Sequence, residues 1–92
     1  MIIRISEEGQ YQVPSSLFDE LNVIDNRIVE LVAGGKEAEY RAELSKLLSC
    51  IRAKGKKLDD TDIMESDVIV PPEDLTLKEA RAIFAGDGLL EG

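Results

Sequence analysis

The residues of this chain with the most obvious potential for chemistry are carboxylates gathered in one short segment. The segment contains Asp59, Asp60, Asp62, Glu65 and Asp67. Carboxylates at this density could bind Ca²⁺, but the spacing lacks the central glycine and the terminal glutamate of an EF-hand loop. We therefore expect a solvated acidic loop and no metal site. An enzyme that uses these carboxylates with Ca²⁺ or Mg²⁺ is the alternative.

Nucleophilic catalysis has few candidate groups in this sequence. The chain contains no histidine and one cysteine, Cys50, so neither a Ser-His nor a Cys-His pair can form. Ser45 and Ser49 have no base to activate them, and Cys50 neighbours Leu47 and Ile51, as a small packed side chain often does. No glycine-rich loop connects a strand to a helix to hold phosphate. We therefore predict a protein that is not an enzyme, with no catalytic residues and no cofactor.

Acidic residues outnumber basic ones by 19 to 11, which gives a formal charge of −8 and a pI near 4.4. Nonspecific binding of nucleic acid needs clustered Lys and Arg, so we expect no direct nucleic-acid partner. A basic protein surface or a neutral apolar groove suits this charge better. One dense basic group consists of Arg52, Lys54, Lys56 and Lys57. We expect it to complement a helix dipole and to pair with the acids that follow it, and a contact with anionic lipid is the alternative.

Size and cysteine content bear on stability and location. A domain of 92 residues hides only about 60 to 65% of its unfolded surface, so a partner, or a second copy in a homodimer, could cover part of its apolar face. A single cysteine favours a reducing compartment. No apolar run approaches the ~18 to 20 residues that span a bilayer, and the apolar start is too short for a signal peptide. We expect a cytoplasmic protein that is peripheral to the membrane only through its partner.

Two apolar series in the middle of the chain predict a helical hairpin. They are Leu17, Leu21, Ile24, Ile28 and Leu31, then Tyr40, Leu44, Leu47 and Ile51. Steps of three and four residues place each series along one side of a helix, so we predict helices over residues 16–33 and 36–54. Ser16 and Asp19 form a weak capping box for the first helix. Gly34 and Gly35 allow a tight turn, because glycine adopts left-handed backbone angles without steric cost.

Shorter patterns flank this hairpin on both sides. Residues 2–6 and 10–13 are β-prone and predict a β-hairpin over residues 2–13. Residues 67–71 are extended, and they either pack across the β-hairpin or form a third edge strand that Pro71 and Pro72 end.

A third helix is predicted over residues 76–85, with Thr76 and Glu79 as its capping box. Its expected buried residues are Leu77, Ala80, Ile83 and Phe84, and Gly86 ends it. We expect Leu89 and Leu90 to pack against the fold or a partner. The prediction is a single domain over residues 1–92 of the α+β class, mainly α: an N-terminal β-hairpin followed by a three-helix domain built on an antiparallel helical hairpin.

The first third of the chain resembles the AbrB and SpoVT family of swapped-hairpin transcription regulators and antitoxins. The similar positions are residues 9–14 (GQYQVP), Leu17, residues 21–23 (LNV) and residues 29–31 (VEL). The resemblance implies DNA binding and a strand in place of the second half of the first predicted helix. The shortage of basic residues and the continuous helical spacing through Ile24 and Ile28 argue against it.

A second resemblance covers nearly the whole chain. The similar positions are residues 3–5 (IRI), 8–11 (EGQY), 17–31, 33–34, 66–74 (SDVIVPPED) and 75–80 (LTLKEA), and Gly86, Gly88 and Leu89. These resemble the PspA-associated domain, PspAA, a small trihelical domain with a leading hairpin. The resemblance implies a cytoplasmic accessory of a phage-shock-type envelope stress response. Its partner would be PspA, a membrane-remodelling coiled-coil protein related to ESCRT-III, and a membrane metallopeptidase is sometimes encoded nearby. No catalytic residue carries over.

For the partner surface we predict exposed acids on the first two helices and the extended segment after the acidic loop. The residues are Asp19, Glu20, Glu43, Val68, Ile69, Val70 and Pro71. An acidic helical hairpin with an apolar seam could bind a basic amphipathic helix of a PspA-like protein. The alternative is that the protein's own core fills both seams.

Overall fold

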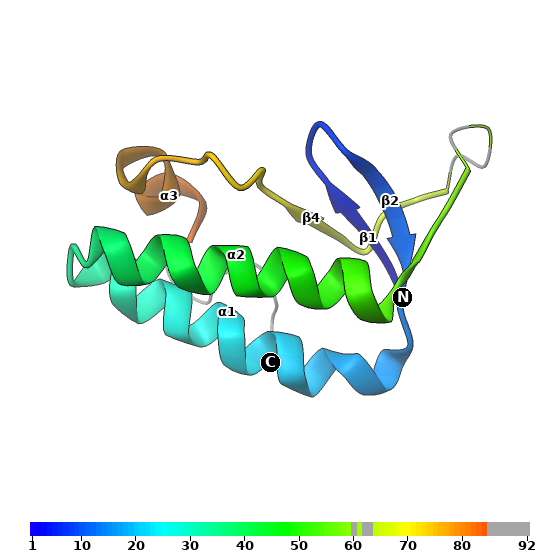
Figure 1. Cartoon of the computed structure of the whole chain (residues 1–92), viewed down its shortest axis with the longest axis horizontal. Helices are drawn as coiled ribbons and strands as arrows, with labels where there is room; N and C mark the ends of the chain where they lie inside the picture. The colour runs from blue at the N-terminus through cyan, green and yellow to red at the C-terminus, as the bar shows by residue number, and fades with distance from the viewer. Residues whose placement is uncertain (60, 62–63, 85–92) are drawn as a thin grey trace.

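Two antiparallel helices lie against one face of a small sheet in the computed structural model of the protein, which describes residues 1–59, 61 and 64–84. Figure 1 shows helices α1 (Phe18–Ala33) and α2 (Glu37–Lys54) along one side, with the strands across the other. A short helix, α3 (Leu77–Ile83), packs at the end where α1 connects to α2. The predicted mainly-α α+β class is confirmed.

The sheet has four strands in the order β3-β2-β1-β4. Strands β1 (Ile2–Ile5) and β2 (Gly9–Gln12) form the predicted antiparallel hairpin, with Ile3 opposite Tyr11. Strand β4 (Val68–Val70) runs parallel to β1 and lies at the edge of the sheet, so the edge-strand alternative for this segment is the correct one. The two-residue strand β3 (Lys56–Lys57), which the sequence analysis did not predict, pairs with β2.

The helical hairpin uses its predicted seams to build the core. The residues of both series are at most 9% exposed: Leu17, Leu21, Ile24, Ile28, Leu31, Tyr40, Leu44, Leu47 and Ile51. They pack with Ile3, Ile5 and Tyr11 from the sheet. The protein's own core therefore fills the seams, and the hairpin cannot offer them to a partner helix.

The start of α1 differs from its prediction. Ser15–Leu17 form a short 3₁₀ helix in which the Leu17 amide donates to the Pro14 carbonyl at 3.0 Å. Leu17 is then the N-cap of α1 and makes no side-chain cap hydrogen bond, so the predicted capping box of Ser16 and Asp19 is wrong. The proline fixes a tight turn that moves the helix start beyond both serines.

The turn between the long helices follows its prediction. Gly35 has φ of 69°, a left-handed conformation that suits glycine. The Lys36 amide donates to the Leu31 carbonyl at 2.9 Å, which satisfies one of the last carbonyls of α1. Since α1 continues unbroken to Ala33, residues 23–31 are not the strand that an AbrB-type fold requires.

Helix α3 begins at its predicted capping box. The Thr76 hydroxyl accepts a hydrogen bond from the Glu79 amide at 3.2 Å, and the Glu79 carboxylate accepts one from the Thr76 amide at 3.3 Å. Phe84 is buried and meets Tyr40 edge to face, with ring centroids 6.5 Å apart. Ile83 is 41% exposed, so its predicted burial is wrong, because the buried line of α3 runs through Ala80 and Phe84 instead. Gly86, Leu89 and Leu90 lie outside the described residues.

Candidate functional site

The sheet has one face against α1 and α2, and we call the opposite face the open sheet face. Side chains alternate between the two faces along each strand, so the open sheet face carries Ile2, Arg4, Gln10, Gln12 and Ile69, of which Ile2 and Gln10 are buried. Arg4 lies in register with Gln10 on one side and with Ile69 on the other. These residues form a row across three strands.

Gln10 holds the segment before β4 against the open sheet face. Its side-chain nitrogen donates to the Met64 carbonyl at 2.5 Å and to the Ser66 hydroxyl at 2.8 Å. Its side-chain oxygen accepts a hydrogen bond from the Met64 amide at 3.3 Å. Gln10 is only 6% exposed, and this full set of partners compensates its burial. No local sequence pattern singles out Gln10, because its partners lie more than fifty positions away along the chain.

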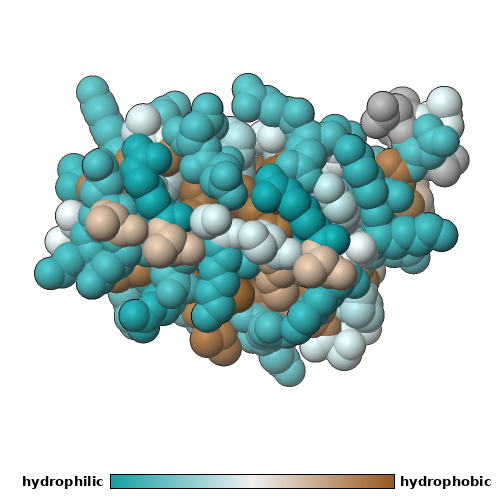
Figure 2. Space-filling view, viewed as in Figure 1, coloured by the Kyte–Doolittle hydropathy of each residue, from teal (hydrophilic) through white to brown (hydrophobic). Residues whose placement is uncertain are grey.

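Apolar and acidic side chains are exposed together along the segment that leads into β4. Ile69 is 59% exposed and Met64 is 48% exposed. Glu65 and Asp67, on the same segment, are also exposed. The Asp67 carboxylate accepts a hydrogen bond from the Ile2 amide at 2.7 Å, which fixes the segment to β1. The face of the molecule that Figure 2 shows is dominated by hydrophilic side chains, with smaller hydrophobic areas between them.

The basic residues at the end of α2 pair with acids from other parts of the fold. The Arg52 guanidinium donates to both carboxylate oxygens of Glu8 at 2.6 to 3.1 Å, and it lies 3.8 Å from Glu73. Lys54 pairs with Glu20 at 2.7 Å. These are not the acids that follow directly in the sequence, with which pairing is predicted, and Asp60 and Asp62 of that segment lie outside the described residues.

The Glu8 carboxylate has the most strongly shifted pKa of this group. The hydrogen bonds from Arg52 and from the Tyr11 hydroxyl lower its pKa from 4.5 to about 2. A lowered pKa in the folded protein stabilises the fold above pH 4.5, and this contribution is lost as the pH falls toward 2. Because 26% of the side chain is exposed, solvent screening limits the contribution to about 1 to 2 kcal/mol.

We expect Glu8→Gln to lower the free energy of unfolding at pH 7 by about 1 to 2 kcal/mol. Between pH 4.5 and 2 the parent should lose stability as Glu8 becomes protonated, and the variant should not show this loss. Urea unfolding followed by circular dichroism across this pH range measures both effects. Glu20→Gln is the matched control, because its pair with Lys54 is half exposed and screened. If the free energy of unfolding of Glu8→Gln and of the parent fell equally between pH 4.5 and 2, the lowered pKa of Glu8 would be contradicted.

The predicted partner-binding residues do not form one surface. Asp19 is exposed and Glu20 is engaged with Lys54, both on α1. Ile69 is exposed on the open sheet face, on the other side of the sheet from the helices. Val68 is half-buried, and Val70 and Pro71 are buried, so the last two cannot contact a partner as predicted.

Glu43 also differs from its prediction as an exposed acid. Its side chain is 18% exposed and pairs with Arg27 of α1 at 3.3 Å, while its second carboxylate oxygen is buried without a hydrogen bond. The pair connects the two long helices across the hairpin. Glu43 therefore acts within the fold.

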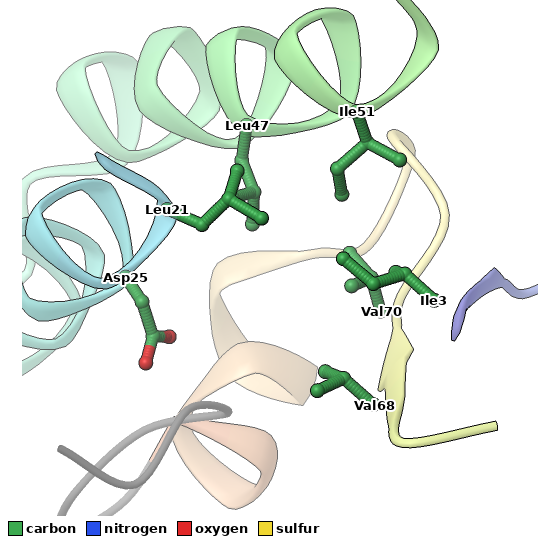
Figure 3. A pocket seen from close by; sticks show the side chains of 7 residues that line it. All are labelled: Ile3, Leu21, Asp25, Leu47, Ile51, Val68 and Val70. Atoms are coloured by element: carbon green, nitrogen blue, oxygen red, sulfur yellow. The ribbon is translucent and has the colours of Figure 1, made fainter. Parts of the chain in front are cut away.

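Asp25 is a buried acid that is not among the predicted site residues. It is fully buried in α1, four residues after Leu21 and three before Ile28, so its position in the apolar rhythm was the available signal. It lines a cavity of about 10 Å³ with Ile3, Leu21, Leu47, Ile51, Val68 and Val70. Figure 3 shows the Asp25 carboxylate directed away from the apolar side chains. This cavity has room for about one water molecule and none for a substrate or cofactor.

A wider polar groove of about 280 Å³ surrounds Arg52. Its lining residues are Ile5, Ser6, Glu7, Glu8, Arg52, Pro72, Glu73 and Asp74. The guanidinium of Arg52 already engages the carboxylates of Glu8 and Glu73. Over residues 1–59, 61 and 64–84, no group of acidic, cysteine or histidine side chains is arranged to hold a metal ion.

In the described part of the chain, no helix is both long enough and apolar enough to cross a bilayer.

Comparisons with curated proteins and with solved structures gave no match. The family model for PspAA, described as PspA-Associated protein, matches residues 1–92. The leading hairpin and the three helices of the structure are the elements that the resemblance implied. This chain is a member of the PspAA family.

Proposed function

We propose that this protein is a non-enzymatic interaction domain that binds a PspA-like coiled-coil protein and serves as its accessory in a membrane or envelope stress response. The observation that carries the proposal is the family match, which spans every residue of the chain and names association with PspA. In this proposal the protein acts in the cytoplasm and reaches the membrane through its partner. A membrane metallopeptidase and a second copy of the chain are further proposed partners.

The state of the candidate nucleophiles supports a role without catalysis. Burial raises the pKa of the Cys50 thiol, which disfavours the reactive thiolate. The Ser45 hydroxyl donates a hydrogen bond to Glu73 at 3.3 Å, in an exposed position. A carboxylate at the surface is too weak and too solvated a base to activate a serine hydroxyl.

Charge supports a basic partner surface. The chain carries a formal charge of −8, and two of the four cations at the end of α2 are engaged with the protein's own acids. Complementary charge raises the rate of association and makes it sensitive to salt. The filled helical seams require that the contact lie elsewhere on the surface.

Co-expression with the PspA-like protein of the same genome tests the proposal. We expect the two proteins to co-purify, and we expect this protein to change the size distribution of the PspA-like assembly in light scattering. Association measured by biolayer interferometry should slow as NaCl rises from 50 to about 500 mM, because charge steering is screened. An unrelated acidic domain of similar size is the control. If the two proteins do not associate at low salt, the proposal is wrong.

A further inference from the structure

We infer that the free edge of β4 binds a second copy of this chain, through antiparallel pairing of the two β4 strands. The second copy is one of the partners in the proposed function, and the inference rests on that part of it. The edge, the register and the kind of contact are new.

The backbone of β4 has one hydrogen-bonding side in use and one side free. The Ser6 amide donates to the Val70 carbonyl at 2.9 Å, so the polar backbone groups of Val70 face β1. Such groups point to alternate sides along a strand, so the amide and the carbonyl of Ile69 face away from β1. β4 is the last strand of the sheet, so no other strand of the described chain pairs with them. A strand added to this edge would satisfy both groups.

The two edges of the sheet differ in their protection against pairing. At the β3 edge, Lys56 and Lys57 are exposed, and lysine on an edge strand disfavours pairing with another chain. β4 has the sequence Val-Ile-Val and no charged side chain. Its outward side chain, Ile69, is 59% exposed, where a polar residue is usual. Pro71 has no amide hydrogen, so pairing is confined to the residues before it.

β4 is complementary to itself about Ile69. If two copies align antiparallel with Ile69 opposite Ile69, the Ile69 amide of each copy donates to the Ile69 carbonyl of the other. The twofold axis is then perpendicular to the sheet, so the helices of both copies lie on the same side. The two Ile69 side chains meet on the open sheet face, and Val68 of each copy lies opposite Val70 of the other. This pairing covers the exposed Ile69 and the half-buried Val68.

The size and the charge of this contact make the dimer weak. Three residues from each copy pair, which is a small interface. Each copy carries a formal charge of −8, so the copies repel each other at low salt. We expect a Kd of about 0.1 mM, and we expect tighter binding in about 500 mM NaCl because salt screens the repulsion. Association with the PspA-like protein is expected to have the opposite salt dependence.

Ile69→Pro tests the edge. The Ile69 amide faces away from β1, so proline should leave the sheet intact while it removes the donor that the second copy needs. We expect the variant to dimerise at least about tenfold more weakly than the parent. Ile69→Val is the matched control, because it keeps the amide and a β-branched side chain and should dimerise like the parent. Sedimentation equilibrium of the full chain up to about 1 mM measures the Kd, and unfolding temperatures verify that both variants fold.

Hydrogen exchange of the parent, followed by NMR, is a second measurement that needs no variant. We expect the Ile69 amide to exchange more slowly at about 1 mM protein than at about 0.05 mM, because the dimer protects it. The amides within α1 should exchange at the same rates at both concentrations.

The outcomes separate this inference from the proposed association with PspA. If the parent is a monomer at about 1 mM, the inference is wrong. It is also wrong if Ile69→Pro folds and dimerises as strongly as the parent, or if a dimer forms without protection of the Ile69 amide. None of these results bears on co-purification with the PspA-like protein. If the parent dimerises through Ile69 but does not bind the PspA-like protein, the inference stands and the proposed association is wrong.

Discussion

Tyr40→Ala is expected to lower the free energy of unfolding by about 3 to 5 kcal/mol, enough to leave a domain of this size barely folded. The Tyr40 ring is fully buried in α2, and its hydroxyl donates to the Leu75 carbonyl at 2.8 Å. The ring also meets Phe84 edge to face at 6.5 Å. One side chain therefore attaches both ends of the segment containing α3 to the helical hairpin. Urea unfolding followed by circular dichroism measures the loss.

Tyr40→Phe separates the hydrogen bond from the packing. This variant keeps the ring and leaves the Leu75 carbonyl without its donor, so we expect a smaller loss of about 1 to 2 kcal/mol. An unfolding midpoint for Tyr40→Ala equal to that of the parent would mean that the segment from Leu75 to Phe84 does not depend on Tyr40.

Gly55→Ala is expected to lower the free energy of unfolding by about 1 to 3 kcal/mol through overpacking. A methyl group at Gly55 would lie 2.6 Å from the Ile51 carbonyl oxygen and 2.7 Å from a methyl carbon of Val13. The backbone at Gly55 has φ of −93°, which any residue can adopt, so the cost is steric. The close approach arises because α2 ends directly against β2 and the residues that follow it. Thermal and urea unfolding of the variant measure the effect.

Gly34→Ala is the matched control for this substitution. Its backbone has φ of −84°, and the nearest atom to an added methyl group is 3.4 Å away. We expect a change within about 0.5 kcal/mol, in either direction, because lower entropy of the unfolded chain offsets the slight crowding. Equal losses for the two variants would show that backbone freedom, and not contact with Val13, is what Gly55 provides.

Local patterns predicted the elements of this fold that depend on local physics. The seams from Leu17 to Leu31 and from Tyr40 to Ile51 repeat over several turns, so their helical period is unambiguous. Gly35 and the box of Thr76 and Glu79 act within a few residues, and both behave as predicted. Pro14 also acts locally, but the tight turn that it begins takes the place of the predicted serine cap, and the helix starts later than predicted.

Features that depend on distant partners could not be predicted from such patterns. The pairing of β4 with β1 joins residues 65 positions apart, and nothing near Val68 indicates a parallel partner. The same limit applies to surface exposure. Asp19 and Ile69 are exposed as expected, but Glu43 turns inward because Arg27 lies across the hairpin, and Pro71 is buried by the fold around it. Of the predicted partner-binding residues, Asp19, Glu20 and Ile69 are therefore the ones that are exposed at the surface.

The place of β1 inside the sheet has a consequence for the order in which the protein forms. β1 is first in the chain, yet it is flanked by β2 on one side and by β4 on the other. On the ribosome, the hairpin of β1 and β2 emerges early, but the Ile2 amide meets the Asp67 carboxylate only after sixty-five more residues have been added. During that interval one side of β1 has no strand partner, and the helical hairpin can already cover its apolar face. The last step is then the closing of a long loop, the kind of nonlocal contact that slows folding.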